Sequence, residues 1–235
     1  MCPSDSRAVL PPTRKGQFIR GVKVGFPIFL GYLPVGLAFG IVAVQAGFSV
    51  PQAVACSAIA LAGAGQFIGV SLVAAGAGLA EILVTNAIIN IRYLLFGATI
   101  APGLRGVPLW QHVLLAHTLT DETFALNTTE MRRGAATSWT MLGVGAVSWT
   151  AWVGATAVGA LATSSIGDPS RWGIDYAMPA MFTALLVGQV ESGRHLFTAG
   201  VAVVLTICAA LVIPGSWSLV AASVGAATVA SVVFR

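Results

Sequence analysis

The chain has 235 residues, of which 57% are apolar and only 9% are charged, whereas roughly a quarter of the residues of a soluble domain are charged. So few charges cannot cover a water-soluble surface, which excludes a soluble enzyme, a disordered protein and a nucleic-acid binder. Three scattered cysteines, Cys2, Cys56 and Cys208, fit neither a disulfide framework nor a zinc site. We therefore expect an all-α, multi-pass membrane protein without metal or cofactor.

Eight apolar segments approach the roughly 20 residues that a membrane-spanning helix needs. In chain order they are residues 24–44, 52–74, 81–100, 110–129, 138–162, 176–189, 196–213 and 217–234. The fourth contains His117, Asp121 and Glu122 and the sixth is short, so the sequence predicts seven or eight spans, with eight preferred. Residues 1–23 form a basic N-terminal segment before one transmembrane domain, residues 24–235.

Basic residues collect on the cytoplasmic side of membrane proteins, and their distribution predicts the orientation. With eight spans, most of them fall on the side of the N-terminus: Arg7, Arg14, Lys15, Arg20, Lys23, Arg132, Arg133, Arg194 and Arg235. Only Arg105 and Arg171 fall on the other side, and Arg92 lies within a span. This pattern predicts that both termini are cytoplasmic.

Helix-breaking residues are concentrated in the first two predicted spans. Helices broken at membrane depth must face protein or a wet cavity, and they build the substrate sites of many transporters. Close helix packing through small residues is the alternative. We expect both spans to be broken and these residues to contribute to a substrate site: Gly31, Pro34, Gly36, Gly63, Gly65 and Gln66.

The same two points suggest an internal duplication of residues 26–66 in residues 149–189. A shift of 123 residues aligns Gly31, Val35, Gly36, Gly65 and Gln66 with Gly154, Val158, Gly159, Gly188 and Gln189. With four spans before the second copy, the repeats would be parallel.

Polar residues within the third span offer further anchors. Asn86 and Asn90 lie one helical turn apart and share a face, and Arg92 follows. Two carboxamides can bind the amino and carboxylate groups of a zwitterion, and Arg92 can hold a carboxylate or neutralise a buried acid. An interhelical asparagine contact with a structural ion pair is the alternative.

The fourth span contains the densest group of titratable residues, His117, Asp121 and Glu122. Ionisable residues within spans usually mark a substrate pathway or a proton relay. In one continuous helix, His117 and Asp121 would lie one turn apart, which suits proton coupling. Solvated charges at the interfacial end of the span are the alternative.

Five tryptophans lie near the ends of predicted spans, as an aromatic belt would have them. They are Trp139, Trp149, Trp152, Trp172 and Trp217. We expect them to mark the membrane interface and not a functional site.

Five motifs follow one another along the chain. They are Leu33-Pro34-Val35-Gly36-Leu37-Ala38-Phe39-Gly40, Ala62-Gly63-Ala64-Gly65-Gln66-Phe67, Asn90-Ile91-Arg92-Tyr93, Thr120-Asp121-Glu122-Thr123-Phe124 and Ile174-Asp175-Tyr176-Ala177. In this order and spacing they resemble the AzlC family, the large subunit of branched-chain amino acid exporters. The family's third motif reads Asn-Leu-Arg-His, so a role of that histidine does not carry over to Tyr93.

The resemblance implies export of leucine, isoleucine and valine, with methionine as a further candidate, driven by the proton-motive force. It implies a place in the inner membrane of a bacterium and a small membrane partner, AzlD. A mostly apolar pocket with few polar anchors would suit such aliphatic substrates.

Three other functions remain open from the sequence. The first is a permease of the ABC type, although the chain has no phosphate-binding P-loop of its own. The second is an intramembrane enzyme, but Gly69-Val70-Ser71-Leu72 resembles a rhomboid motif only in its shortest form, and His195 falls in a predicted loop. The third is a channel or scaffold, which would need no coupling acid. We expect no catalytic residues.

Overall fold

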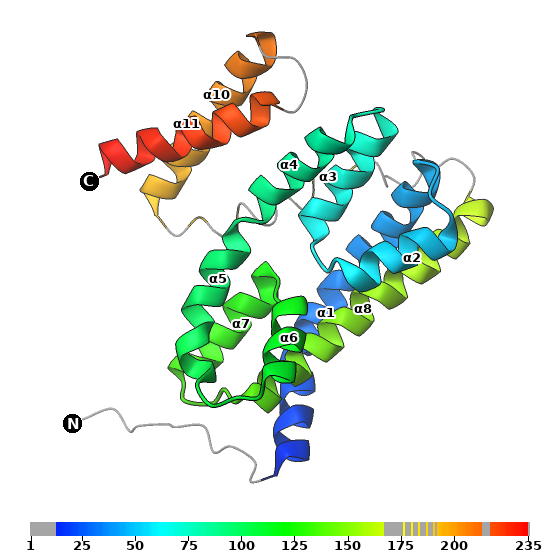
Figure 1. Ribbon diagram of the computed structural model, residues 1–235, viewed down its shortest axis with the longest axis vertical. Helices are drawn as coiled ribbons and strands as arrows, with labels where there is room; N and C mark the ends of the chain where they lie inside the picture. Colours follow the sequence, from blue (N-terminus) through cyan, green and yellow to red (C-terminus); the bar gives the residue numbers. More distant parts are fainter. Residues whose placement is uncertain are drawn as a thin grey trace.

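The computed structural model describes residues 13–166, 192–212 and 217–234, with isolated positions between 176 and 190. The regular elements of these residues are helical (Figure 1): α1 (Arg14–Gln45), α2 (Val50–Ile59), α3 (Gly63–Ala74), α4 (Leu79–Asn90), α5 (Arg92–Ile100), η1 (Ala101–Leu104), α6 (Leu109–His117), α7 (Asp121–Arg132), α8 (Ser138–Ile166), α10 (Gly193–Val212) and α11 (Trp217–Val233). Within the described residues, four helical stretches are long and apolar enough to cross a membrane: Arg14–Gln45, Leu79–Leu104, Ser138–Ser165 and Gly193–Val212. The all-α membrane architecture is therefore confirmed.

Helices α1 and α8 form the central wall of the molecule and run in the same direction. Along this seam Gly21, Gly25, Gly36 and Gly40 of α1 meet Thr140, Val144, Ala155 and Thr156 of α8, in that order. A Cβ atom at Gly36 would approach Ala155 Cβ to 2.8 Å. The seam therefore depends on the absence of side chains, as close-packed membrane helices do.

The break predicted in the first span is wrong, because α1 is continuous through Pro27 and Pro34. Each proline removes one backbone hydrogen bond, but neighbouring helices in a membrane bundle hold such a helix together, and here α8 packs along most of its length. The helix also begins ten residues before the predicted span (24 minus 14), where the Thr13 side chain accepts a hydrogen bond from the Gly16 N–H at 3.1 Å.

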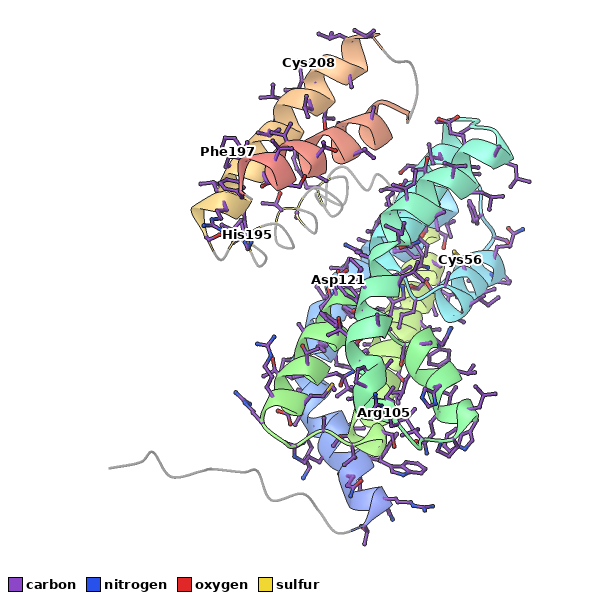
Figure 2. All side chains as sticks on the ribbon, turned by 60° about the vertical axis from the view of Figure 1, so that its left-hand side comes forward. Cys56, Arg105, Asp121, His195, Phe197 and Cys208 are labelled. Carbon is purple, nitrogen blue, oxygen red and sulfur yellow. The ribbon has the colours of Figure 1, made fainter. Side chains whose placement is uncertain are left out.

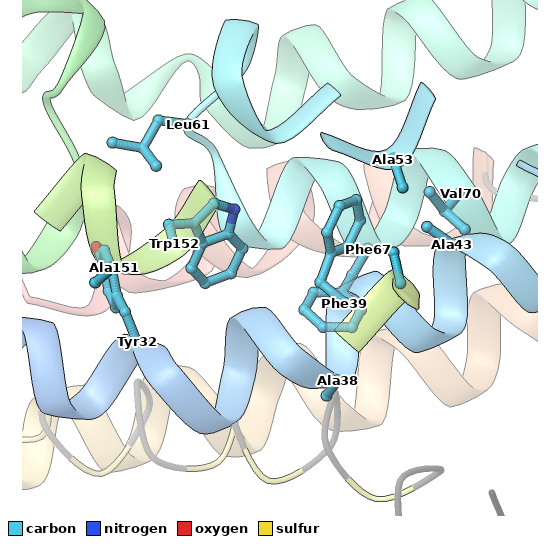
Figure 3. Packing of buried hydrophobic residues seen from close by; sticks show 11 residues of the cluster. Tyr32, Ala38, Phe39, Ala43, Ala53, Leu61, Phe67, Val70, Ala151 and Trp152 are labelled. Atoms are coloured by element: carbon cyan, nitrogen blue, oxygen red, sulfur yellow. The ribbon is translucent and has the colours of Figure 1, made fainter. Parts of the chain in front are cut away.

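The second predicted span folds as a hairpin of two short helices, α2 and α3. Ala53 of α2 and Val70 of α3 both lie beside Ala43 of α1, whereas Leu61 in the connection lies beside Trp152 (Figure 3). Arms of 10 and 12 residues extend about 15–18 Å, half the roughly 30 Å of a hydrocarbon core. The predicted break in this span is confirmed, but it lies at residues 60–62, just before Gly63.

The fourth predicted span is also a hairpin, formed by α6 and α7, because residues 118–120 interrupt it. At its open end the Trp110 and Trp139 rings lie 5.8 Å apart and Glu130 pairs with Arg20. At its tip Thr120 Oγ1 lies 2.7 Å from Tyr32 Oη. The two hairpins therefore enter the bundle from opposite ends, and their tips meet near the middle of α1.

Helices α4 and α5 cross the bundle as one bent unit between the two hairpins. A tight turn at Ile91 joins them, in which the Ile91 N–H donates to Ile88 O at 3.3 Å and the Leu94 N–H donates to Ile91 O at 3.1 Å. The turn lies inside the Asn90-Ile91-Arg92 motif. The sequence gives no signal for this turn, because it contains neither glycine nor proline.

The hairpin of α2 and α3 changes the side on which later loops emerge. Arg105 was predicted opposite the N-terminus, but it lies toward the end of the bundle where α1 begins (Figure 2). There Leu104 packs in one cluster with Met141, Phe18 and Met131. A hairpin returns the chain to the side it came from, so the next crossing ends on the N-terminal side, together with Arg20 and Arg132.

Near the C-terminus, α10 and α11 pack against each other, and α11 also contacts α4. They confirm the helices predicted over residues 196–213 and 217–234. Most of the predicted span 176–189 lies outside the described residues. So do these residues: Cys2, Arg7, Arg171, Trp172, Gly188, Gln189, Arg235 and the side chain of Trp217. Helices α1 and α8 run parallel, as the duplication would require, but the duplication itself stays a prediction.

Candidate substrate site

A cavity of about 440 Å³ lies where the tips of the two hairpins meet the middle of α1 and α8. Its lining comes from the four parts of the chain that converge there and from Tyr93 of α5. The lining residues are Pro27, Ile28, Gly31, Tyr32, Val35, Leu61, Gly63, Ala64, Tyr93, Thr120, Asp121, Glu122 and Trp152. Most of them are apolar, and the two carboxylates lie together on the tip of α7.

The first hairpin lines the cavity with Leu61, Gly63 and Ala64, at the point where its two helices meet. Ala60 and Ala62 have non-helical dihedral angles, and α3 begins at Gly63 without a side-chain cap. A Cβ atom at Gly63 would lie 3.1 Å from the Trp152 ring. Glycine at this position therefore allows the first turn of α3 to approach the indole closely.

The second hairpin presents side chains, and a local capping motif positions them. Thr120 is the N-cap of α7: its hydroxyl accepts from the Thr123 N–H at 3.2 Å, and its own N–H donates to Thr123 Oγ1 at 2.8 Å. This places Asp121 and Glu122 in the first turn of α7. The positive end of the helix dipole favours acidic side chains there.

The two adjacent carboxylates have different partners. Asp121 forms an ion pair with Arg92, whose Nη2 lies 2.8 Å from Asp121 Oδ2. Arg92 is the first residue of α5 and directly follows the turn at Ile91. Its guanidinium lies 5.5 Å from the centroid of the Tyr93 ring. The ion pair joins the bend of the α4–α5 unit to the tip of the second hairpin.

Glu122 instead accepts a hydrogen bond from the Tyr32 hydroxyl at 2.6 Å. Tyr32 is buried, with 8% of its surface exposed, and it meets Trp152 edge to face with centroids 5.2 Å apart. Among the salt bridges of the described residues, none includes Glu122. Glu122 is therefore an acid at the edge of an apolar cavity with a neutral hydroxyl as its hydrogen-bond donor.

Behind the cavity, a chain of buried hydrogen bonds fixes the Trp152 wall. The Trp152 indole donates to Gln66 Oε1 at 2.9 Å, and Gln66 Nε2 donates to Ser57 Oγ at 3.2 Å. Ser57 Oγ in turn lies 2.8 Å from Thr156 Oγ1. The chain ties α2 and α3 to α8, so Gln66 supports the wall of the cavity without lining it.

The structure brings together part of the predicted site. Gly31, Gly63, Asp121 and Glu122 line the cavity, while Arg92 and Gln66 contact lining residues. Gly36 belongs to the seam of α1 and α8. Pro34 lies within continuous α1, and neither residue is part of the lining.

Gly65, Asn86 and Asn90 form a helix contact beside the cavity. A Cβ atom at Gly65 would lie 2.8 Å from both Asn86 Oδ1 and Asn90 Nδ2, and Asn86 Nδ2 donates to Ile82 O at 3.2 Å. This is the interhelical arrangement that the sequence left open as the alternative to substrate anchoring.

His117 lies apart from the two acids. It is the last residue of α6, and residues 118–120 separate it from α7, so the predicted one-turn spacing does not form. It lines a different pocket, together with Trp110, Trp139 and Trp149. The predicted group of three titratable residues is therefore a pair of acids and a distant histidine.

Sequence reasoning missed Tyr32, Tyr93, Thr120 and Trp152 as lining residues. Trp152 was predicted in the interfacial belt, but it is 3% exposed and lies at the middle of α8. Tyr32 offered a signal, because tyrosines usually gather at span ends and this one lies well inside a span. In the described residues, no group of His, Cys, Asp and Glu has the arrangement of a metal site.

Comparison with known proteins gives one family. The model of the family described as "AzlC protein" matches residues 27–166, which include every residue that lines the cavity. No solved structure matches the chain.

Several curated relatives match over most of their length. The inner membrane protein YgaZ of Escherichia coli K12 is 31% identical, over 79% of this chain and 78% of its own. An uncharacterised membrane protein of Helicobacter pylori J99 is 29% identical, over 83% and 87%. The branched-chain amino acid transport protein AzlC of Bacillus subtilis is 24% identical, over 83% and 77%.

Proposed function

The chain belongs to the AzlC family of membrane proteins, and we propose that it exports branched-chain amino acids across the inner membrane. Leucine, isoleucine and valine would be the substrates, with methionine a further candidate, and the proton-motive force would drive export. A small membrane subunit of the AzlD kind would be its partner. The printed name of the Bacillus subtilis relative supports the substrate class.

The observation that carries this proposal is the position of the cavity. It lies at the middle of α1 and α8, where two half-length hairpins from opposite ends meet. Secondary transporters commonly bind their substrates near the bilayer midplane, between interrupted helices of this kind. A membrane scaffold would not need a cavity there.

The chemistry of the cavity suits an aliphatic amino acid. Ile28, Val35, Leu61 and Trp152 provide apolar surface for a branched side chain, and a volume of about 440 Å³ lies in the range of about 300–1,000 Å³ of small-molecule sites. Glu122 offers a carboxylate to the ammonium group of the substrate.

Efflux measurements test this proposal. Cells preloaded with labelled leucine, isoleucine, valine or methionine would carry this chain alone, this chain with a co-expressed small subunit of the AzlD kind, or an empty vector. We expect efflux above the vector that depends on the small subunit and is abolished by a protonophore. Valine and leucine should leave faster than the control amino acid lysine, whose charged side chain does not suit apolar walls.

Absence of efflux in every combination, from a protein shown to be in the membrane, would reject amino acid export. Efflux that persists with a protonophore but fails on ATP depletion would instead support an ABC-type permease. Efflux by the chain alone would show that the small subunit is not needed. The proposed substrates and driving force would then stand without it.

A further inference from the structure

The two acids at the tip of α7 are not equivalent, and their difference concerns coupling. Asp121 is neutralised by Arg92 at 2.8 Å. Glu122, the next residue, has the Tyr32 hydroxyl at 2.6 Å as its hydrogen-bond donor. Among the described residues, no cationic side chain pairs with Glu122. A cation that enters the cavity is therefore attracted to Glu122 more than to Asp121.

The titratable and charged groups around Glu122 are few. Tyr32 faces it from α1, Asp121 precedes it on α7, and Arg92 with Tyr93 comes from α5. The parts of α3 and α8 that line the cavity contribute Gly63, Ala64 and Trp152, none of which is titratable. His117, at the end of α6, lines the other pocket.

We infer that Glu122 couples transport to proton movement by binding either a proton or the ammonium group of the substrate, and never both. The inference rests on the proposed function. An ionised carboxylate in a low-dielectric cavity attracts an ammonium group strongly. A protonated Glu122 offers no charge, so protonation releases the substrate.

The resulting cycle is balanced. On the cytoplasmic side, Glu122 releases its proton and binds a zwitterionic amino acid through the ammonium group. On the opposite side, a proton from that solution binds the carboxylate and the amino acid leaves, still zwitterionic. One proton moves inward for each amino acid exported, so one positive charge enters and both the pH gradient and the membrane potential drive export.

Asp121 has a different role in this scheme as a positioning residue. Its ion pair with Arg92 holds the α4–α5 bend against the tip of α7, and the pair has no net charge. As long as Asp121 is paired with Arg92, it therefore does not compete with Glu122 for the ammonium group.

Proton release on substrate binding provides the test. Leucine would be added to the purified full-length protein, with its small subunit where the wild type needs it, in weakly buffered solution containing a pH indicator. At the pH where the affinity for leucine is half its maximum, half of the free Glu122 carries a proton, so we expect about half a proton released per leucine bound, rising to about one proton well below this pH. Below this pH the leucine Kd should rise about tenfold per pH unit, as one competing proton requires.

The matched variants are Glu122→Gln and Asp121→Asn, which replace neighbouring acids by their neutral amides. Glu122→Gln should bind leucine at least about tenfold more weakly, with no proton release and no dependence of Kd on pH. Asp121→Asn should bind more weakly as well but still release a proton. Glu122→Asp keeps a carboxylate at this position and, unlike Glu122→Gln, should still release a proton when leucine binds. A purely structural role of Glu122 would not explain this difference.

The outcomes separate the inference from the proposed function. Wild-type protein that binds leucine without releasing a proton, and whose leucine Kd does not rise as the pH is lowered, overturns the inference and leaves amino acid transport intact, even if every variant fails to fold. Release that persists in Glu122→Gln but disappears in Asp121→Asn assigns coupling to Asp121 and also overturns it. Protein that binds none of the four amino acids contradicts the proposed function itself.

Discussion

Gln66 shows how a residue can matter to a cavity that it does not line. It is 5% exposed and accepts the hydrogen bond of the Trp152 indole while donating to Ser57. Removing the carboxamide leaves the Trp152 N–H without its acceptor and Ser57 Oγ without this donor. A buried donor or acceptor that loses its partner costs about 1–3 kcal/mol.

We therefore expect Gln66→Ala to lower the free energy of unfolding by about 1–3 kcal/mol and to weaken leucine binding, because the Trp152 wall loosens. Thermal unfolding in detergent and leucine titration measure the two effects. Ser71→Ala, on the exposed side of the same helix, is the control and should change neither. Normal leucine affinity in a destabilised Gln66→Ala protein would show that the wall does not depend on this hydrogen bond.

At the scale of single residues, the sequence predicted which charged residues belong to the site better than it predicted which of them contact one another. Arg92 was predicted either to hold a substrate carboxylate or to neutralise a buried acid, because isolated charges at membrane depth are expensive. In the structure it pairs with Asp121. Which acid pairs with Arg92 depends on the turn at Ile91 and on the cap at Thr120, two local features that place side chains from distant segments. Tyr32 and Trp152 were missed because amphipathic aromatic residues suit both an interface and a cavity wall.

At the scale of the helices, two glycines of α1 separate packing from binding. Gly40 faces the backbone of α8, where a Cβ atom would lie 2.7 Å from Ala160 N and closer still to Thr156 O. Gly31 lines the cavity, and a Cβ atom there would have no heavy atom within 4 Å. One methyl group therefore has opposite consequences at the two positions.

We expect Gly40→Ala to lower the thermal unfolding midpoint markedly, because α1 and α8 must separate to admit the new atom. Gly31→Ala should keep or raise the midpoint, since alanine favours a helix by about 1 kcal/mol over glycine, while narrowing the cavity. Thermal unfolding of the two variants in the same detergent gives the comparison. Equal midpoints would mean that the seam is not as tightly packed as the structure has it.

Hydropathy predicted which residues form helices but not which of these helices cross the membrane. Residues 138–162, 196–213 and 217–234 were correctly assigned to helices, because long apolar segments have few other options in a membrane. A half-length hairpin and a full span have the same composition, however, so residues 52–74 and 110–129 were assigned as crossings. Proline likewise indicates a break only where neighbouring helices do not hold the backbone, and α8 holds α1.

For the whole molecule, the hairpins invert the predicted sides of two loops. The eight-span prediction puts residue 78 in the cytoplasm and residue 105 outside. With α2–α3 as a hairpin, α4, whose N-cap is Gly78, begins at the end of the bundle opposite the start of α1 (Figure 1). Arg105 lies at the end where α1 begins (Figure 2). Single cysteines at these positions, in a chain whose Cys2, Cys56 and Cys208 are replaced, distinguish the two topologies.

We expect Arg105→Cys to be protected from a membrane-impermeant maleimide in intact cells and labelled after lysis. Gly78→Cys should be labelled in intact cells; its backbone has a negative φ of −69°, which any residue adopts. Cysteine at Arg133, which both topologies put in the cytoplasm, is the control. The reverse pattern would restore the crossings predicted from hydropathy.

The hairpins also set the order in which the chain can mature. Neither one reaches across a bilayer, and the first carries Gln66 and Ser57, whose partners on α8 follow 86 and 99 residues later in the chain. A ribosome that has finished α2 and α3 has therefore made a short apolar hairpin whose buried polar side chains, Ser57 and Gln66, still lack their partners on α8. That hairpin must wait near the insertion machinery or at the membrane surface until α8 emerges, so the substrate site is completed only late in synthesis.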